Sequence, residues 1–343
     1  MRVHIAAAAF AALLLLCAVA GMAAAGGYSI TDLAGGHTSE ALAINDAGQI
    51  VGYSDGHACL WQNGTITDRG TLPGDIVSWA CGINDAGQIV GRSEDASGYY
   101  HACLWQNGAV TDLGTLPGYD SSGAYAINDA GQIVGSSYTA AGGPEHACLW
   151  QNGTVTDLGT LPPFVDSYAL AINDAGQIVG CSDEHACLWQ NGAITGLATL
   201  PGGIYGGASA INAAGQIVGW SDWSEDAGHY EHACLWQNGA ITDLGTLPGD
   251  SDSAASGIND AGQIVVESGN FFDGGYYGHA CFWQNGAITD LGTLPGDSWS
   301  WASGINDAGQ IVGWSEDAGY NEHACLWQPA AGITKSADVR AAA

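Results

Sequence analysis

The chain has 343 residues, and its 35 acidic residues against five Lys and Arg leave a formal net charge of −30 at pH 7. A field of this sign repels phosphate backbones and anionic lipid, so the composition excludes nucleic acid as a partner and favours cations and solubility. The length is ample for one large domain with a buried core.

Residues 1–25 predict a secretory signal peptide. Arg2 precedes an apolar stretch over residues 5–20, and small residues follow at 23–25. The stretch is short for a bilayer span, which disfavours a membrane anchor. We therefore expect cleavage after Ala25 and a soluble chain, secreted or at the cell surface, with no membrane span. Loss of Arg2 leaves four basic residues against 35 acidic ones, a net charge of −31.

Two motifs recur seven times in the rest of the chain. The first, Ile-Asn-(Asp/Ala)-Ala-Gly-Gln-Ile-Val, has its Asn at 45, 84, 128, 173, 212, 259 and 306. The second, His-Ala-Cys-(Leu/Phe)-Trp-Gln, begins at His57, His101, His146, His185, His232, His279 and His323. Successive Asn positions are 39 to 47 residues apart, which is typical of four-stranded propeller blades and longer than most solenoid repeats.

Each repeat carries two strand signals before its His. Ala-x-(Ala/Gly)-Ile-Asn predicts strand A, and its small side chains suit a crowded central axis, so we expect A to be innermost. Asp-Ala-Gly is a three-residue hairpin loop whose glycine can take the left-handed conformation. Gln-Ile-Val-Gly then predicts strand B, which is almost wholly apolar, as expected where neighbouring blades cover both faces. The sixth copy departs from this pattern with Val266-Glu267.

The second half of the repeat predicts strands C and D. His-Ala-Cys-Leu-Trp-Gln is strand C, with His, Cys and Trp on one face. In six copies Asn-Gly follows between strand residues, which is a strong hairpin signal. Strand D is (Ala/Thr)-(Ile/Val)-Thr-Asp-Leu-Gly-Thr-Leu, and the proline after it ends the ladder.

These elements predict an all-β fold, a seven-bladed β-propeller built from seven 39–47 residue repeats over residues 26–335, with a short tail over 336–343. Residues 28–33 match strand D and precede the first strand A. We therefore predict that they close the ring by pairing with the blade that contains residues 323–328, with the C-terminal segment displaced or added at its edge.

The motif set Ile-Asn-Asp-Ala-Gly-Gln-Ile-Val-Gly, His-Ala-x-Leu-Trp and Gly-x-Ile-Thr-Asp-Leu-Gly-Thr-Leu-Pro-Gly resembles the HAF-repeat extracellular proteins, named for a His-Ala-Phe triplet. The resemblance covers roughly residues 28–334. It differs in the Phe position, which is Cys in all seven copies here. The resemblance implies export and a repeat fold, and it implies no established activity.

The seven repeat cysteines are predicted to be buried small hydrophobes, because an odd set of equivalent thiols cannot pair off. Cys181 and Cys187 flank a short loop and could form a disulfide. The His-x-Cys pairs could bind a soft metal, but a site needs three or four converging ligands. We therefore predict no metal site there and expect His to fix a turn by hydrogen bonding. Asn-Asp-Ala-Gly lacks the later carboxylate of a calcium loop, which favours a plain turn.

Loop length varies in the B–C and D–A connections. The longer B–C loops mix carboxylates with aromatic residues and would form an acidic, aromatic rim on one face. These loops are the predicted ligand contacts, and they also offer the best position for a weakly bound calcium ion, the one cofactor considered. The candidate residues are Glu94, Asp95, Tyr99, Tyr100, Trp223, Glu225, Asp226, Tyr230, Phe271, Phe272, Asp273, Tyr276 and Tyr277.

The predicted function is that of a binding or interaction scaffold for an extracellular protein or glycan, acting as a monomer. Catalytic sites join unlike residues, whereas this chain offers nearly the same residues seven times, so we do not predict an enzyme. Two alternatives stay open. One is a propeller hydrolase or lyase with an axial site, and the other is a calcium-dependent carbohydrate-binding protein.

Overall fold

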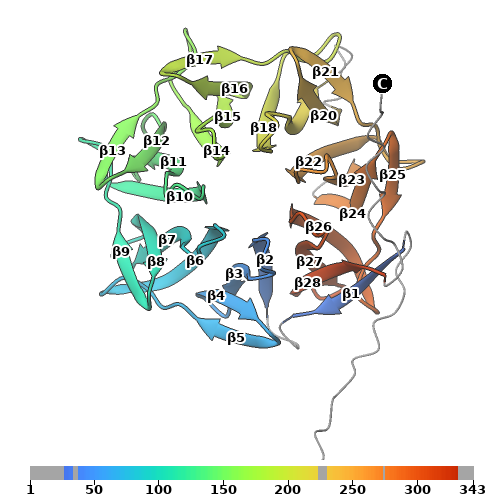
Figure 1. Ribbon diagram of the computed structural model, residues 1–343, viewed down its shortest axis with the longest axis horizontal. Helices are drawn as coiled ribbons and strands as arrows, with labels where there is room; N and C mark the ends of the chain where they lie inside the picture. Colours follow the sequence, from blue (N-terminus) through green and yellow to red (C-terminus); the bar gives the residue numbers. More distant parts are fainter. Residues whose placement is uncertain (1–26, 34–37, 223–229, 273–274, 331–343) are drawn as a thin grey trace, which may run out of the picture.

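The computed structural model of the protein describes residues 27–33, 38–222, 230–272 and 275–330. These residues form seven four-stranded antiparallel sheets, arranged radially around a central axis (Figure 1). The predicted all-β, seven-bladed β-propeller is therefore confirmed. No helix in the described ranges has the length and apolar character to cross a bilayer. The predicted signal peptide and the tail over 336–343 lie outside the described residues.

The strands follow one another from the axis outward in each blade. Blades one to four contain β2 (Ser39–Ile44), β3 (Ile50–Ser54), β4 (His57–Gln62) and β5 (Thr65–Asp68); β6 (Asp75–Ile83), β7 (Ile89–Asp95), β8 (Tyr100–Gln106) and β9 (Ala109–Asp112); β10 (Ser121–Ile127), β11 (Ile133–Tyr138), β12 (His146–Gln151) and β13 (Thr154–Asp157); and β14 (Tyr168–Ile172), β15 (Ile178–Ser182), β16 (His185–Gln190) and β17 (Ala193–Gly196).

Blades five to seven repeat this order. They contain β18 (Gly206–Ile211), β19 (Ile217–Asp222), β20 (Glu231–Gln237) and β21 (Ala240–Asp243); β22 (Asp252–Ile258), β23 (Ile264–Phe272), β24 (Gly275–Gln284) and β25 (Ala287–Asp290); and β26 (Asp297–Ile305), β27 (Ile311–Asp317) and β28 (Glu322–Pro329), completed by β1 (Tyr28–Asp32).

The hairpins within a blade follow the predicted turn chemistry. In blade one, Gly48 has φ 73° in the loop between β2 and β3. Asn63 and Gly64 have φ 52° and 73° between β4 and β5, the two positive values that a type I′ turn requires. Because neighbouring strands are antiparallel, the A–B and C–D turns lie on one face of the propeller. The B–C and D–A loops lie on the opposite face.

The core consists of layers between blades. Ile50, Cys59 and Trp61 of blade one pack against Val312 and Ala324 of blade seven in one cluster. The adjacent residue Val51 points the other way and packs against blade two. Alternation therefore buries both faces of each sheet, which explains the continuous apolar stretch of strand B.

Strand A is innermost as predicted, but its small residue has a different role. Ala41 is fully buried in the cluster between blades one and seven. The axis itself is open at the A–B turns, where Ile44, Asn45 and Asp46 help to line a cavity of about 240 Å³. The small side chain is needed because two sheets approach closely near the axis.

The ring closes as predicted. β1 pairs antiparallel with β28, from Tyr28 opposite Pro329 to Asp32 opposite Cys325. In Figure 1, β1 forms the outer strand of the blade that holds the last described residues. The N-terminal strand therefore completes blade seven. The C-terminal segment that was expected to be displaced or added at its edge starts beyond residue 330, outside the described residues.

Strand D is shorter than predicted. In blade one it ends at Asp68, and Leu-Gly-Thr-Leu of the motif lies beyond the strand in the blades that carry it. The Asp68 carboxylate accepts a hydrogen bond from the Gly70 amide at 2.6 Å, and Gly70 has φ 72°. This turn directs the chain out of the ladder before the proline is reached.

The repeat cysteines are buried, as predicted, and all nine cysteines in the described ranges are free. Cys181 and Cys187 therefore form no disulfide. Gly180, not Cys181, lies opposite Cys187, so the two thiols point to opposite faces of the sheet. Burial raises the pKa of the Cys59 thiol to about 11, which disfavours the thiolate that metals bind.

In four blades the repeat histidine bonds to the Asp that ends strand D, and the same carboxylate accepts the glycine amide two residues later in the turn that follows. In five blades its Nδ1 lies 2.8 to 3.2 Å from an Asp carboxylate, and in four of these the Asp ends strand D eleven residues later. The bond to Asp290 raises the pKa of His279. In blade four the D-strand position is Gly196, and His185 bonds to the Asp183 carbonyl instead. The expectation that His fixes a turn by hydrogen bonding is therefore confirmed in blades one, three, five and six, and also in blade four.

Candidate functional site

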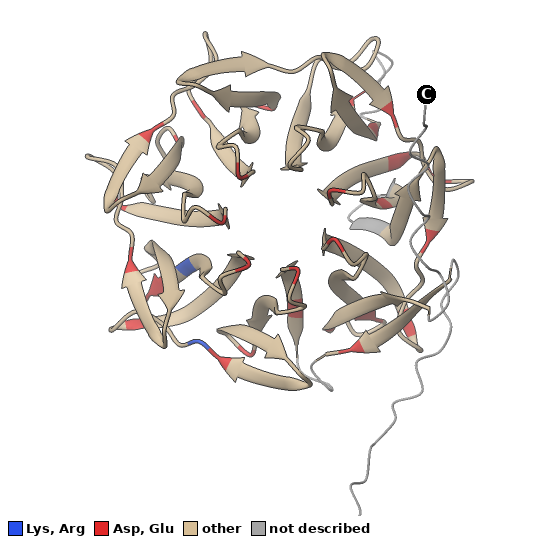
Figure 2. Ribbon diagram, in the orientation of Figure 1, with Lys and Arg blue, Asp and Glu red and all other residues tan. Residues whose placement is uncertain are grey.

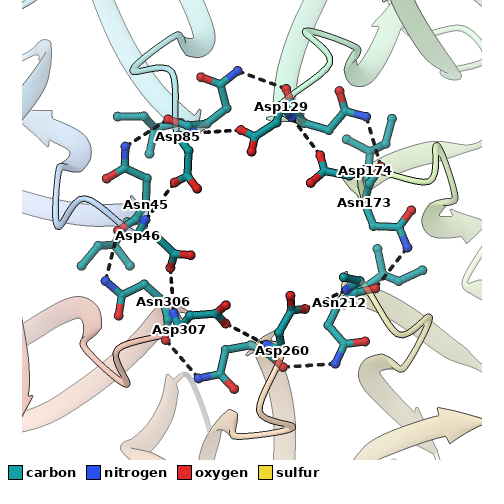
Figure 3. A pocket seen from close by; sticks show the side chains of 18 of the residues that line it. Asn45, Asp46, Asp85, Asp129, Asn173, Asp174, Asn212, Asp260, Asn306 and Asp307 are labelled. Carbon is teal, nitrogen blue, oxygen red and sulfur yellow. Dashed lines mark hydrogen bonds between the residues drawn. The ribbon is translucent and has the colours of Figure 1, made fainter.

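The A–B turns build a closed ring of hydrogen bonds around the axis (Figure 3). Each motif Asn donates from Nδ2 to the backbone carbonyl of the Asn in the next blade, at 3.0 to 3.1 Å. Asn306 donates to Asn45 and so completes the circle across 261 residues of sequence. The Asn side chain also accepts a bond from the Gln four residues later, for example Gln177 on Asn173. Each Asn therefore fixes its own turn and the adjacent blade.

A second ring, made of Asp carboxylates, lies inside the Asn ring, nearer the axis (Figure 3). In six of seven positions the backbone amide of one blade donates to the Asp Oδ1 of the next, at 2.8 to 3.0 Å. The ring is interrupted at Ala213, which replaces the Asp of the next blade. The backbone amide of Asp174 therefore has no carboxylate there to which it can donate. Burial raises the pKa of Asp46, and the charges of Asp307, Asp85 and Asp260 raise it further.

Figure 2 shows this acidic ring at the inner ends of the blades. The carboxylates are already bonded to backbone amides, which gives them a structural role. In the part of the chain that the structure describes, no group of three or more His, Cys, Asp or Glu is placed to hold a metal ion. We therefore interpret the axial opening as the hub that holds the blades together.

The two rings lead to a testable difference in stability. Asn173→Ala removes three hydrogen bonds of a side chain that is 6% exposed, with Gln177 and with the Asn212 carbonyl. We expect a loss of about 3 kcal/mol in the free energy of unfolding. The adjacent Asp174→Ala, which reproduces the natural Ala213, should lose about 1 kcal/mol or less. Urea denaturation of both variants measures the difference, and equal losses would contradict the assignment of the Asn ring as the main lock.

The predicted contact residues that the structure describes lie on the opposite face, and some of them have structural roles. Asp95 accepts hydrogen bonds from the Ser97 and Tyr99 amides and so shapes the β7–β8 turn. The guanidinium of Arg92 lies between two aromatic contacts. Its Cζ is 4.7 Å from the ring centroid of Tyr100 and 5.1 Å from that of Trp79. These contacts make blade two a packed cluster.

The other predicted residues are distributed as follows. Glu94 is half-buried on β7, and Tyr99 and Tyr230 are exposed. The backbones of β23 and β24 pair Phe271 with Tyr276 and Asn270 with Tyr277, and Phe272 follows on β23. The remaining predicted residues lie outside the described ranges, namely Trp223, Glu225, Asp226 and Asp273.

A recess on this face lies at blades four and five, and sequence reasoning missed it. Two adjoining cavities of about 560 and 420 Å³ share Glu184 and Tyr205. We call them together the blade-four groove. It is lined by Phe164, Asp166, Tyr168, Asp183, Glu184, His185, Ile204, Tyr205, Trp220, Asp222 and Glu231.

The loops of the groove are held by two carboxylates. Asp183 accepts the amides of Val165 and Asp166 at 2.7 and 3.2 Å. Asp222 does the same for Ile204 and Tyr205, both at 2.7 Å. Each B–C loop thereby holds the D–A loop beside it, which sets the positions of the aromatic side chains that these loops carry.

The aromatic rings of the groove form a short row. Phe164 stacks on His185 with ring centroids 4.2 Å apart, and Tyr205 meets the other side of His185 at 6.0 Å. His185 bonds through Nδ1 to the Asp183 carbonyl at 2.6 Å. A carbonyl can only accept, so Nδ1 carries a proton.

The B–C turn at the centre of the groove has an unfavourable backbone. Asp183 and Glu184 have φ 42° and 59°. The equivalent turn of blade one is Asp55-Gly56, where glycine adopts φ 89° without steric cost. A side chain in the left-handed region costs roughly 1 to 2 kcal/mol. Glu184 therefore places an exposed carboxylate beside the aromatic row at a position where another blade has glycine.

Two sequence signals could have pointed to this groove. The B–C turn of blade four is among the shortest in the chain, which leaves the neighbouring D–A loops uncovered. These D–A loops also depart from the common Leu-Pro-Gly-Asp pattern, with Phe164 after Pro162-Pro163 and with Ile204-Tyr205 after Gly203. The sequence favoured the long acidic loops as the ligand contacts, because sequence shows differences in loop length and does not show which loops lie side by side.

The comparisons with known proteins support the fold. The acylaminoacyl peptidase of Pyrococcus horikoshii matches with a TM-score of 0.54 and 11% identity, over 85% of this chain and 51% of that one. YCF48 bound to D1 peptide matches with a TM-score of 0.51 and 11% identity, over 88% and 94%. An extracellular domain from B. thetaiotaomicron gives 0.48 and 10%, over 87% and 40%. The chain thus spans about half or less of two of these proteins.

No protein-family model matches the chain, and a search of curated proteins finds no match. The identities are low, so the similarity concerns the β-propeller fold alone. That fold occurs in the acylaminoacyl peptidase and in YCF48, which was solved bound to D1 peptide.

Proposed function

We propose that the protein is an exported binding module of the HAF-repeat type, and that its ligand-binding surface is the face of the B–C and D–A loops. The observation that carries the proposal is the blade-four groove. This groove gathers aromatic and acidic side chains from neighbouring loops and strands in one recess, and its Glu184 stands where blade one has Gly56. Recessed sites with a few placed polar groups are where ligands bind most often.

Binding is favoured over catalysis by the state of the polar groups. The carboxylates of Asp183 and Asp222 accept backbone amides, and His185 is bonded to a carbonyl, so these groups hold loops in place. The proposal places the protein outside the cell or on its surface as a monomer, with an extracellular protein or glycan as its partner. The acidic character makes nucleic acid an unfavourable partner.

The groove can be tested by removing its aromatic row. Three proteins are each applied to a glycan array and to a panel of cell-envelope proteins. They are the mature parent chain, the double variant with Phe164→Ala and Tyr205→Ala, and the single variant Tyr320→Ala. Tyr320 is a matched control because it lies on the same face in blade seven and is 77% exposed. We expect the double variant to lose binding by about tenfold or more, and the control to bind as the parent chain does.

Three results would count against this function. The double variant could retain full binding, the Tyr320 control could lose as much as the double variant, or the parent chain could turn over an ester, peptide or glycoside substrate. Thermal melting of each variant shows whether a loss reflects binding or folding. Addition of a chelator tests the calcium-dependent alternative, since glycan binding that disappears with calcium would favour it.

A further inference from the structure

We propose that the blade-four groove binds a cationic segment of a protein, with an arginine or lysine side chain seated between its aromatic row and its carboxylates. This inference rests on the proposed function and adds the chemistry of the ligand. It starts from the charges of the groove. Among the described residues, the charged groups that line it are carboxylates, on Asp166, Asp183, Glu184, Asp222 and Glu231, and no Lys or Arg lines either cavity.

The carboxylates of the groove differ in what they already bind. Asp183 and Asp222 are engaged by backbone amides. The Glu184 carboxylate makes no side-chain hydrogen bond or ion pair within the described residues. Its exposed position on a left-handed turn brings an acceptor to the point that the two cavities share. A donor from a ligand can therefore bind there without displacing an internal partner.

The aromatic rings supply the second part of cation recognition. Phe164 and Tyr205 flank His185, and Trp220 lies in the adjoining cavity. The electron-rich faces of such rings attract guanidinium and ammonium groups. The protein contains one such arrangement of its own, in which Arg92 lies over Trp79 and Tyr100 on the same face of blade two. In the blade-four groove the rings and carboxylates are present, and the cation would come from the ligand.

A peptide fits these groups better than a neutral glycan does. Guanidinium has five N–H donors and no acceptor, which matches a lining of carboxylates. The net charge of −30 attracts a basic segment over a longer distance. Two adjoining cavities also suit an extended chain that places one side chain in each.

The test compares two fluorescein-labelled nonapeptides that differ only in charge. One carries two arginines in an Ala-Gly background, and the other carries citrulline at the same positions. We expect the arginine peptide to bind the parent chain at least about tenfold more tightly by fluorescence anisotropy, and this preference to shrink as NaCl rises from about 0.05 to 0.5 M. Tyr205→Ala should weaken the arginine peptide by about tenfold.

A charge-matched pair of variants separates the groove from general attraction to an acidic protein. Glu184→Gln should weaken the arginine peptide by about fivefold. Asp112→Asn makes the same charge change on the outer strand of blade two, and its side chain can still accept the Gly114 amide, so binding should not change. Equal weakening by both variants would overturn the proposal.

Other outcomes are also decisive. Equal affinity for the arginine and citrulline peptides would overturn the inference. A glucosamine tetramer that binds more tightly than the arginine peptide would also overturn it, because that result would indicate an amino-sugar glycan as the ligand. The proposed function would survive these results if Phe164→Ala with Tyr205→Ala still abolished binding on the array. If that double variant bound every ligand normally, the function itself would fail.

Discussion

A chain that begins after residue 33 is expected to lose about 5 kcal/mol in free energy of unfolding, because the ring can no longer close. β1 contributes Tyr28 and Ile30, which are 5% and 6% exposed and pack in one cluster with the fully buried Trp327. Its removal exposes these contacts and leaves the backbone of β28 without its outer neighbour. Urea denaturation of the truncated chain and of a chain that begins at residue 26 measures the loss.

Two point variants test the same strand without changing chain length. Ile30→Ala should cost about 2 to 4 kcal/mol, since it leaves a cavity between blades six and seven. Ser29→Ala, on the opposite face of β1, removes one long hydrogen bond of 3.5 Å to Gln328 and should cost well under about 1 kcal/mol. If the truncated chain were as stable as the control, or if both point variants behaved alike, β1 would not be the closing strand.

Glu267→Gln is expected to stabilise the protein increasingly as pH rises. Glu267 is 3% exposed on β23, and burial raises its pKa from 4.5 to about 9. The folded state binds this proton up to about pH 9, whereas the unfolded chain releases it near pH 4.5. Stability is therefore full below pH 4.5 and falls by about 1.4 kcal/mol per pH unit until the pH passes the folded pKa.

The gap between the variant and the parent should widen by about 4 kcal/mol from pH 5.5 to pH 8.5. Both values avoid the isoelectric region near pH 4.1. Glutamine has nearly the same shape and does not titrate, so groups that the two proteins share, such as His279, cancel in the comparison. Urea denaturation at three pH values measures the gap. Parallel stability curves would show that Glu267 reaches water or a partner in solution and titrates normally.

The repeat made much of the fold predictable from sequence. The alternation of His-Ala-Cys-Leu-Trp and the Asn-Gly and Asp-Ala-Gly turns act between residues that are close in the chain, so the strands and hairpins follow from local geometry. Seven copies then determined seven blades. Residues 28–33 and the degenerate segment at residues 332–335 make eight D-like segments for seven blades, and the match of residues 28–33 to strand D indicated closure by the N-terminus.

Contacts between blades were decided by the tertiary structure. From sequence, the motif around Asn45 predicts a plain turn. Only the ring geometry brings the side-chain amide of Asn45 to the Asn84 carbonyl, and the side-chain amide of Asn306 to the Asn45 carbonyl. The blade-four groove is likewise made of one B–C turn, the D–A loops on either side of it and strands of blades four and five. Glu184 is one exposed residue in a short turn until Phe164 and Tyr205 are placed beside it. The sequence by itself determined each blade, since neighbours in the chain determine turns and strand alternation. Only the packing of seven sheets around one axis decided the hub and the groove, because their residues lie tens to hundreds of positions apart.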